Sequence, residues 1–357
     1  MRGRKKASSR KVEGILGVRI EEVIRLYAAA LAHAGLPTRS TAARRLIRIQ
    51  VERRFRNVLT KGGIVRFKRN RRGRLEAAIF AVPGSFVFVH RESETHWSFD
   101  LFSAPGPRSE VARTNAWFSR ELRRIRPMIG EKIDSYLEVW QRPLLPELRR
   151  LGIHAVGLAL RGRIDRALAG LRAHYPELER ELRESSYRLR PIRTRRDVRA
   201  YIEIIRAEFT RNPKFGWFVA DPKFIDEMKT DLFENLRRKR DWAWVFERNG
   251  DVVGGFDFFL PKKGPFAFLA QGSFGLNLAR THQGKGLARF AYWVALKEMR
   301  RSGARFFGGT TGQPGVLRLA QVMGRRCTGI EVLGASRPPF PKRYFDRSFR
   351  SLVHDAR

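Results

Sequence analysis

One short segment constrains the fold of this chain more than any other: the run Gln283-Gly284-Lys285-Gly286-Leu287-Ala288. It follows the strand-like residues 274–278 and opens a segment from Leu287 to Met299 in which apolar residues recur at helical spacing. A strand, a tight glycine turn and a helix start, in that order, leave backbone N–H groups unpaired at the positive end of a helix dipole. Because such an arrangement binds phosphate, the segment predicts a site for a nucleotide-type cofactor.

The spacing of small residues in this loop distinguishes between phosphate-binding motifs. A dinucleotide fingerprint, G-x-G-x-x-G/A, would need its third small residue at Arg289, and the chain contains no G-x-x-x-x-G-K-S/T run. Gln283, Gly286 and Ala288 instead fit the pattern Q/R-x-x-G-x-G/A. In this respect the loop resembles the pyrophosphate loop of the GCN5-related N-acetyltransferase (GNAT) superfamily.

The pattern of residues 187–335 is similar to that family's order of elements, β-α-α-β-β-β-α-β-α-β. Two β-rich runs flank the turn Asn249-Gly250-Asp251, which is a strong hairpin signal. Asp197 is placed to cap the first helix, and Gly303 to end the helix after the loop. The resemblance implies an α+β fold, in three α/β layers, with a mixed, mostly antiparallel twisted sheet flanked by helices. The predicted elements are strands at 187–192, 242–246, 252–260, 267–278, 305–308 and 328–333, and helices from 197 and at 224–236, 287–301 and 316–323.

Acetyl-coenzyme A, or another acyl-coenzyme A, is the cofactor that the resemblance implies. Glycine at 284 and 286 would let the backbone approach the pyrophosphate oxygens. In the family, the strand before the loop splays from its neighbour, and its free N–H groups face the thioester and pantetheine. One of them, here assigned to Leu278, stabilises the developing oxyanion. A glycine turn without a ligand is the alternative. The implied cofactor-binding residues are Leu276, Asn277, Leu278, Gln283, Gly284, Lys285, Gly286, Leu287, Ala288 and Gln313.

The chain departs from the family where a proton donor is expected. Many members carry an Asn at the start of the helix after the fifth strand, and a Tyr seven residues later that protonates the leaving thiolate. Those places hold Gln313 and Ala320 in this chain. Gln313 can still bond the pantetheine arm, whereas the acid must lie elsewhere, be water, or be dispensable because a thiol leaves easily. Tyr344 is the most available tyrosine in the second half, with aromatic packing or a surface role as the alternative.

A general base must deprotonate an ammonium before the amine attacks, and four acids are candidates. We assign the role to Asp257, because it is the acid inside an apolar strand run. Glu247 lies on the same hairpin, while Glu203 and Glu208 fall on the first helix, where solvated positions are common. The aromatic segment 211–218 lies where the family places a substrate-covering loop. It could contact an amine through cation–π interactions or close the core.

The first half of the chain is predicted to be a degenerate copy of the second. The segment 151–157 mirrors 323–329 at an offset of 172, and the hairpin at 65–83 resembles 245–261 at an offset of about 178, which indicates duplication. The copy has Ala104 to Arg113, with two prolines, at the place of the phosphate turn, and proline lacks a donor N–H. We therefore predict a basic disordered arm at 1–11, a degenerate GNAT-like domain at 12–160 that does not bind the cofactor, a helical connector at 161–186 and a catalytic domain at 187–357.

The chain carries 73 Lys and Arg against 35 Asp and Glu, for a net charge of +38. Such an excess attracts polyanions, so nucleic acid is a plausible partner. An arginine-rich genome explains the same composition, because arginine is spread over almost every predicted helix. The single cysteine, Cys327, excludes a disulfide framework and most zinc sites, and the histidines show no metal-ligand spacing. With no apolar run of about 18 residues and no signal-peptide pattern, we expect a cytoplasmic protein without a membrane span.

Together these features predict transfer of an acetyl or other acyl group from coenzyme A to an amine, on a small molecule or a protein, by direct attack in a ternary complex. A FemABX-like transferase, which uses aminoacyl-tRNA, also pairs two GNAT-like halves and would suit the charge, but it does not depend on a coenzyme A loop. A third hypothesis is a non-enzymatic nucleic-acid-binding or regulatory protein that kept the fold. No pattern in the sequence indicates the oligomeric state.

Overall fold

The computed structural model describes residues 12–16, 19–33, 38–55, 58–60, 63–82, 84–91, 96–129, 132–211, 222–238, 242–259 and 271–334. The basic arm predicted at 1–11, the proposed acid Tyr344 and most of the segment 211–218 lie outside these residues. The described residues divide into two compact units. Unit 1 comprises residues between 12 and 155 together with 329–334, and unit 2 comprises residues between 156 and 328.

Unit 1 is a mostly antiparallel sheet with helices on both faces. Its strand order is β1-β3-β4-β5-β6-β7-β14, and the one parallel pair among them is β6 with β7. The helices α1 (Ile20–His33) and α2 (Thr41–Phe55) pack on one face, while α3 (Arg108–Ile125) lies over Phe80 on the other. The strands are β1 (Val12–Leu16), β2 (Leu59–Thr60), β3 (Gly63–Arg69), β4 (Leu75–Val82), β5 (Ser85–Arg91), β6 (His96–Ser103), β7 (Lys132–Glu138) and β14 (Arg326–Gly334), and α4 (Leu145–Arg150) follows β7.

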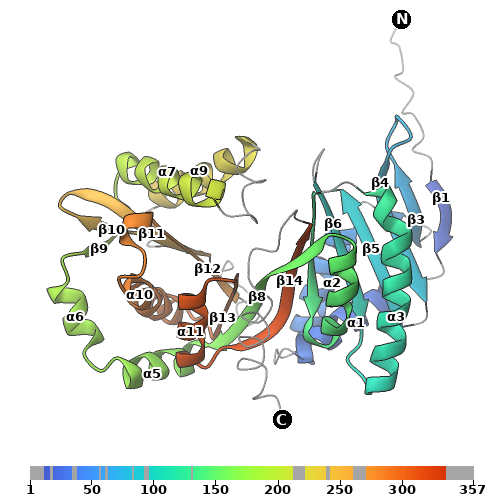
Figure 1. Cartoon of the computed structure of the whole chain (residues 1–357), viewed down its shortest axis with the longest axis horizontal. Helices are drawn as coiled ribbons and strands as arrows, with labels where there is room; N and C mark the ends of the chain where they lie inside the picture. Colours follow the sequence, from blue (N-terminus) through green and yellow to red (C-terminus); the bar gives the residue numbers. More distant parts are fainter. Residues whose placement is uncertain are drawn as a thin grey trace, which may run out of the picture. The chain divides into compact units, whose positions relative to one another are not determined.

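Unit 2 repeats this plan. Its strand order is β9-β10-β11-β12-β13-β8, again with one parallel pair, β12 with β13. The helices α7 (Arg195–Arg211) and α9 (Pro222–Arg237) cover one face, and α5 (Ile164–His174), α10 (Leu287–Arg301) and α11 (Pro314–Val322) lie on the other (Figure 1). The strands are β8 (Ile153–Arg163), β9 (Arg188–Pro191), β10 (Ala243–Arg248), β11 (Asp251–Phe259), β12 (Gln271–Leu278) and β13 (Phe306–Thr311), and α6 (Leu178–Glu184) follows α5.

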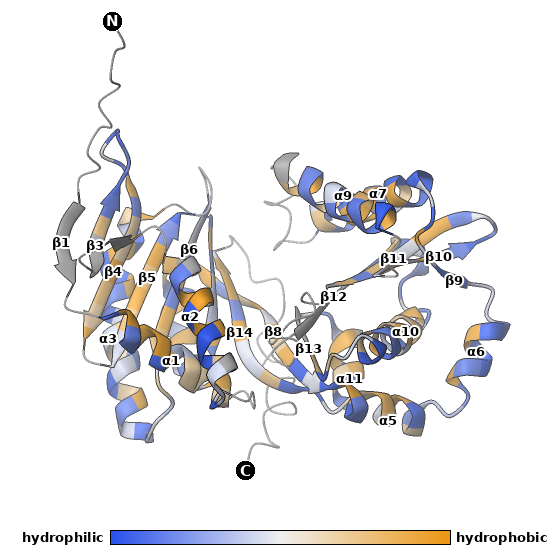
Figure 2. Cartoon of the chain, turned by 180° about the vertical axis from the view of Figure 1, so that it is seen from behind, coloured by the Kyte–Doolittle hydropathy of each residue, from blue (hydrophilic) through white to orange (hydrophobic). Residues whose placement is uncertain are grey.

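The layering follows from the spacing of apolar residues. In Figure 2 the helices α7 and α9 alternate between hydrophilic and hydrophobic residues, and the buried members of α7 include Val198, Ile202 and Ile205, which pack with β10. The predicted fold class, and most predicted elements of the second half, are confirmed. The hairpin of β10 and β11 turns at Asn249 and Gly250, whose φ angles of 52° and 87° are typical of the expected two-residue turn.

Two predicted boundaries differ from the compact units. Residues 161–186, predicted as a connector, lie within unit 2: they complete β8, and α5 and α6 supply core residues such as Leu168 and Leu178. The last strand, predicted to complete the second domain, pairs with β7 of unit 1 from Gly329 to Leu333. Reciprocally, β8 of the first half pairs with β13 of unit 2. The exchanged strands contain the two mirrored segments, and local pattern could not reveal the exchange because it says nothing about distant pairing partners.

The hairpin predicted at an offset of about 178 is shifted by one strand from its structural counterpart. Residues 65–83, predicted to correspond to β10 and β11, form β3 and β4 and do not include β5. Counting outward from the parallel pair of each unit, β11 corresponds to β5 and β10 to β4. The duplication of topology is therefore clear, but the equivalent hairpin is β4 with β5, whose alternating apolar residues resemble those of the neighbouring hairpin.

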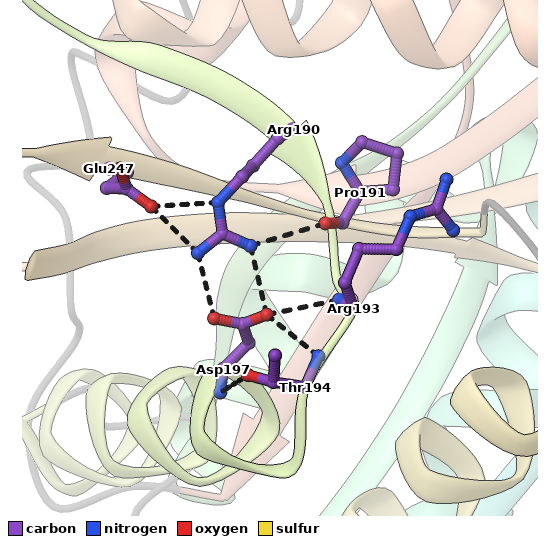
Figure 3. Close-up of polar contacts among 6 residues, drawn as sticks. All are labelled: Arg190, Pro191, Arg193, Thr194, Asp197 and Glu247. Atoms are coloured by element: carbon purple, nitrogen blue, oxygen red, sulfur yellow. Dashed lines mark hydrogen bonds and ion pairs between the residues drawn. The ribbon is translucent and has the colours of Figure 1, made fainter. Parts of the chain in front are cut away.

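Arg190 joins β9 to α7 and β10 (Figure 3). Its guanidinium donates to both carboxylate oxygens of Asp197 at 2.9 Å and to Glu247 on β10 at 2.8 Å. Asp197 also accepts from the N–H groups of Arg193 and Thr194 at 3.0 Å. The hydroxyl of Thr194, which precedes α7, accepts from the N–H of Asp197 at 3.1 Å, so the two residues form a capping box. Asp197 therefore helps to cap α7 as predicted, but from the third position of the helix rather than from the residue before it. Burial opposes the charge of Asp197, yet these bonds hold its pKa well below the ordinary value.

Candidate functional site

The glycine loop forms the predicted strand, turn and helix. β12 ends at Leu278, and α10 begins at Leu287. Gly284 and Gly286 have φ angles of 75° and 76°, a region in which other residues are strained, and a Cβ at Gly284 would meet no atom within 4 Å. In the described part of the chain, the N–H groups of residues 284–288 donate to no backbone carbonyl. They are available at the N-terminus of α10, as a phosphate site requires.

The side chains around the loop leave this site positive. Leu287 is buried in the core of unit 2 and Ala288 packs against it, so these two residues offer backbone groups alone, while Lys285 is exposed. The first turn of α10 contains no acid. Residues 271–328 contain ten Lys or Arg and a single acid, Glu298. Two acids from outside this segment approach it, but each is already engaged: Glu208 accepts from Gln283, and Glu181 pairs with Arg289 at 2.7 Å. The helix dipole and the surplus of basic side chains therefore favour an anion here.

β12 and β13 separate beside the loop. Their parallel pairing runs over three residues, from Gln271 with Phe306 to Ser273 with Gly308. β12 then continues to Leu278 with β11 as its partner, and β13 continues to Thr311 with β8 as its partner. The facing edges of 274–278 and 309–311 consequently have no strand between them in the described residues. We call this separation the strand opening.

The hydrogen-bond alternation along β12 decides which N–H groups face the strand opening. The N–H of Ala279 donates to Val253 O at 3.0 Å, which fixes the antiparallel register with β11. N–H groups two residues apart point the same way, so that of Asn277 is turned to β11, while those of Leu276 and Leu278 are turned to the opening. The N–H groups of Leu276 and Leu278 are thus open to a ligand, whereas that of Asn277 is used within the sheet, because successive N–H groups of a strand point to opposite neighbours.

The side chain of Gln283, the first residue of the loop motif, forms hydrogen bonds to two other residues of the protein. Its Nε2 donates to Leu278 O at 2.9 Å and to Glu208 Oε2 on α7 at 2.7 Å. The amide thereby joins the end of β12 to α7. The neighbouring His282 has its Nδ1 3.0 Å from Tyr187 Oη, and burial lowers its pKa, so it shapes the loop as a neutral ring.

Gln313 and Ala320 lie on α11, which follows β13. Gln313 is the N-cap residue of that helix and is exposed, at the end of a strand that borders the opening. Its amide can therefore reach a ligand there. Ala320 is fully buried. The described residues thus place no hydroxyl at the position where the family carries its acid.

Asp257, the predicted base, faces α7 from the sheet. The hydroxyl of Tyr201 donates to Asp257 Oδ1 at 3.2 Å, and the Asn277 side chain bonds the same hydroxyl. Burial raises the pKa of Asp257 to about 6, and the charge of Asp231 on α9 adds to the rise, against the opposing effect of the Tyr201 bond. A carboxyl with such a pKa is suited to accept a proton near neutral pH.

The other three candidate bases are engaged elsewhere. Glu247 is held by Arg190, Glu208 accepts from Gln283, and Glu203 is exposed in an ion pair on the surface of α7. Sequence reasoning missed Tyr201, which is completely buried in α7. Its position within the apolar stripe of that helix was the available signal, because a buried phenol needs a hydrogen-bond partner.

The described residues contain no group of His, Cys, Asp and Glu that could hold a metal ion, and none of their helices is long and apolar enough to span a membrane. Cys327 is buried.

The second half of the chain matches a known family model, and the whole chain is similar to solved structures. Residues 200–324 match the family model described as Acetyltransferase (GNAT) family. A solved GCN5-related N-acetyltransferase from Sphaerobacter thermophilus is 12% identical, with a TM-score of 0.51 over 92% of this chain and 96% of that chain. A tandem GNAT protein from the clavulanic acid biosynthesis pathway is 14% identical, with a TM-score of 0.42 over 89% and 95%. No curated protein matches the chain.

Proposed function

We propose that this chain, whose residues 200–324 match the model of the acetyltransferase (GNAT) family, transfers an acetyl or other acyl group from coenzyme A to an amine. The observation that carries the proposal is the strand opening between β12 and β13, directly beside a glycine loop with available N–H groups. An extended ligand with a pyrophosphate at one end can lie with its phosphates on the loop and its arm along the strand edge.

The residues present fit acyl-coenzyme A. The N–H groups of 284–288 suit the pyrophosphate, and a Cβ at Gly284 would meet no atom within 4 Å. The Arg289 side chain lies beside Gly286, with its Nε 3.3 Å from the place of a Cβ there, and a guanidinium suits a phosphate. Backbone groups of Leu276 and Leu278 and the amide of Gln313 suit the amides of the pantetheine arm. When bound, acyl-coenzyme A supplies a thioester whose carbonyl carbon is open to attack by an amine.

The residues around the opening have separate roles in the transfer. Asp257 takes the proton that the acceptor ammonium loses, so that the nitrogen can form its bond to the acyl carbon as the carbon–sulfur bond breaks. The N–H of Leu278 donates to the carbonyl oxygen, where negative charge develops. The nitrogen loses its second proton to water as the amide forms, and water returns a proton to the departing sulfur, because Ala320 carries no donor.

The charge distribution favours a cationic acceptor. Residues 222–259, which include α9, β10 and β11, contain seven Lys or Arg and eight Asp or Glu, in contrast to the strongly basic segment 271–328. Asp257 and Asp231 belong to this less basic part, on the α7 and α9 side of the sheet. α7 on the same side adds five Arg and three acids, so this side stays close to neutral, and an ammonium is less strongly repelled there than at the glycine loop.

Calorimetry of the full chain with acetyl-coenzyme A tests the binding step. We expect micromolar affinity, and tRNA is titrated in parallel at several salt concentrations. The proposal would be contradicted if acetyl-coenzyme A produced no heat of binding while tRNA bound in a salt-sensitive way. That result would favour the aminoacyl-tRNA-dependent alternative.

Release of free thiol from acetyl-coenzyme A in the presence of a panel of amines tests the chemical step. Asp257→Asn should lower kcat by about 10²- to 10⁴-fold, with little change in the affinity for acetyl-coenzyme A. Glu227→Gln on the exposed side of α9 is the control. Equal activity of Asp257→Asn and the wild type would exclude Asp257 as the base.

A further inference from the structure

Tyr201 is a buried residue whose hydroxyl is used on a carboxyl rather than on the backbone. Its side chain is completely inaccessible, and Oη lies 3.2 Å from Asp257 Oδ1. The Asn277 side chain from β12 bonds the same hydroxyl. Because Asn277 can donate to the phenol oxygen while the phenol donates onward, the three side chains form a directed chain that ends on Asp257.

Two glycines make room for this chain of side chains. A Cβ at Gly255 on β11 would lie 2.9 Å from two carbons of the Tyr201 ring. A Cβ at Gly275, which is the register partner of Asp257 on β12, would lie 3.1 Å from Asp257 Oδ1. Glycine inside a strand weakens it, so these positions indicate a close approach that the sheet must accommodate.

We propose that Tyr201 is a positioning residue, which holds one carboxylate oxygen of Asp257 and leaves the other to take the proton from the acceptor amine. The inference rests on the proposed function. A free carboxyl on a strand samples several χ2 orientations, and a proton transfer requires one of them. The bond from a hydroxyl that is itself fixed by Asn277 selects that orientation.

The groups that face Asp257 give the direction of the expected pH effect. From α7 comes the Tyr201 hydroxyl, from α9 the charge of Asp231, from β12 the amide of Asn277, and its register partner on β10 is the apolar Ala243. Of these, the Tyr201 bond stabilises the carboxylate and so lowers the pKa of Asp257. Removal of the hydroxyl should raise that pKa, so that, as the pH falls, Asp257 is protonated and stops acting as a base at a higher pH.

The test compares the pH profiles of kcat/KM for the wild type, Tyr201→Phe and Tyr292→Phe. Tyr292 is the matched control, because it is nearly as buried, lies in α10 on the other face of the same sheet, and accepts a bond from Arg325 at 3.3 Å. Both variants keep the ring and lose one buried hydroxyl. We expect the acidic limb of Tyr201→Phe to move up by about one pH unit, which is about a tenfold loss of kcat/KM at low pH. The limb of Tyr292→Phe should not move.

A second readout separates this inference from the proposed function. The carboxyl carbon of Asp257, followed by NMR in the full-length protein without substrate, should titrate at a higher pH in Tyr201→Phe. Turnover with no shift in either readout, or equal shifts in both variants, would overturn the role of Tyr201 alone. A titration shift in a protein that turns over no amine would overturn the proposed function and retain the bond between Tyr201 and Asp257.

Discussion

The parallel strand pair of unit 1 stays closed where the equivalent pair of unit 2 opens. β6 and β7 pair over five residues, to Asp100 with Tyr136, against three residues for β12 and β13. Beyond that point the fully buried Gln141 donates to Leu101 O at 3.0 Å and to Ser103 Oγ at 3.2 Å. The backbone of β6 is therefore satisfied by the protein's own amide, at the place where unit 2 leaves its strand edge open to a ligand.

The helix that follows each of these strands differs in the same sense. α3 follows Pro107, which has no N–H, and its first turn carries Glu110. A carboxylate oxygen of Glu110 lies 3.0 Å from the place of a Cβ on Gly106, so the acid occupies the loop before the helix. α10 follows Gly286 and has no acid in its first turn. An acid at a helix N-terminus satisfies the dipole and repels phosphate. This adds to the missing N–H of proline, on which the prediction that unit 1 does not bind the cofactor rests.

A substitution that destabilises unit 2 directly has the largest expected effect, and it tests whether the two units unfold together. Asp197→Ala leaves Arg190 without its bidentate partner, although Glu247 still pairs with it, so we expect a loss of about 1.5–3 kcal/mol, the range for hydrogen bonds to charged groups. Urea unfolding measures this loss. Because the units exchange β8 and β14, we expect one shared transition, and two separate transitions would contradict that coupling. Glu203→Ala, on the same helix but exposed, should change the free energy of unfolding by less than about 0.5 kcal/mol.

The same pair predicts an acid dependence of stability. The folded pKa of Asp197 is lowered, so its stabilising contribution is present above its unfolded value near 3.9 and is lost as the pH falls through the lower folded value. Wild-type stability should therefore fall steeply below about pH 4. In Asp197→Ala that part of the decline should be missing, which unfolding curves between pH 2 and 6 would measure.

Gly286→Glu is expected to weaken acetyl-coenzyme A binding by more than about 100-fold, or about 2.7 kcal/mol. The substitution strains a residue in the left-handed region and places a carboxylate where the phosphates would bind. Glu110 places a carboxylate in the first turn of the equivalent helix of unit 1. Gly303→Glu is the matched control, because it has a φ of 84° near the other end of α10 and its Cβ would meet nothing within 4 Å. A similar loss of affinity in the control would mean that backbone strain, rather than charge at the loop, causes the effect.

The smallest expected effects are those of substitutions at Gln141 and Gln313, two residues that are 172 positions apart and follow equivalent strands. We expect the first substitution to change stability and the second to change cofactor affinity. Gln141→Ala leaves Leu101 O and Ser103 Oγ without its bonds, so it should cost about 1–3 kcal/mol of unfolding free energy and leave cofactor affinity unchanged. Gln313→Ala, at an exposed position, should barely affect unfolding and should weaken acetyl-coenzyme A binding by up to about tenfold. The reverse assignment of effects would show that the two amides do not have these roles.

The sequence predicts those features that depend on neighbours along the chain. The hairpin at Asn249-Gly250, the cap at Asp197 and the bounds of α10 follow from turn chemistry, capping and helical periodicity, and the structure confirms them. The glycine loop is also local, since its N–H groups come from consecutive residues. The assignments of site residues to the cofactor and to catalysis stay predictions.

Features that join distant segments could not be predicted in this way. The bond between Tyr201 and Asp257 spans 56 residues, and that between Gln283 and Glu208 spans 75. Which N–H groups of β12 face the opening depends on its register with β11, which the pattern of apolar residues does not fix for the polar Asn277. The closure of the first opening by Gln141 was likewise invisible, because a glutamine after a strand has no characteristic pattern.

The exchange of β8 and β14 affects the order in which the protein can fold during synthesis. β7 ends at Glu138, but its partner from Gly329 onward is translated almost 200 residues later, which at typical rates is about 10 to 40 s. Throughout that interval the edge of β7 is unpaired, and β8 is the next strand to leave the ribosome. A nascent chain that pairs β7 with β8 would close unit 1 early and deprive β13 of its partner, so the growing chain must avoid or undo the pairing of these two consecutive strands.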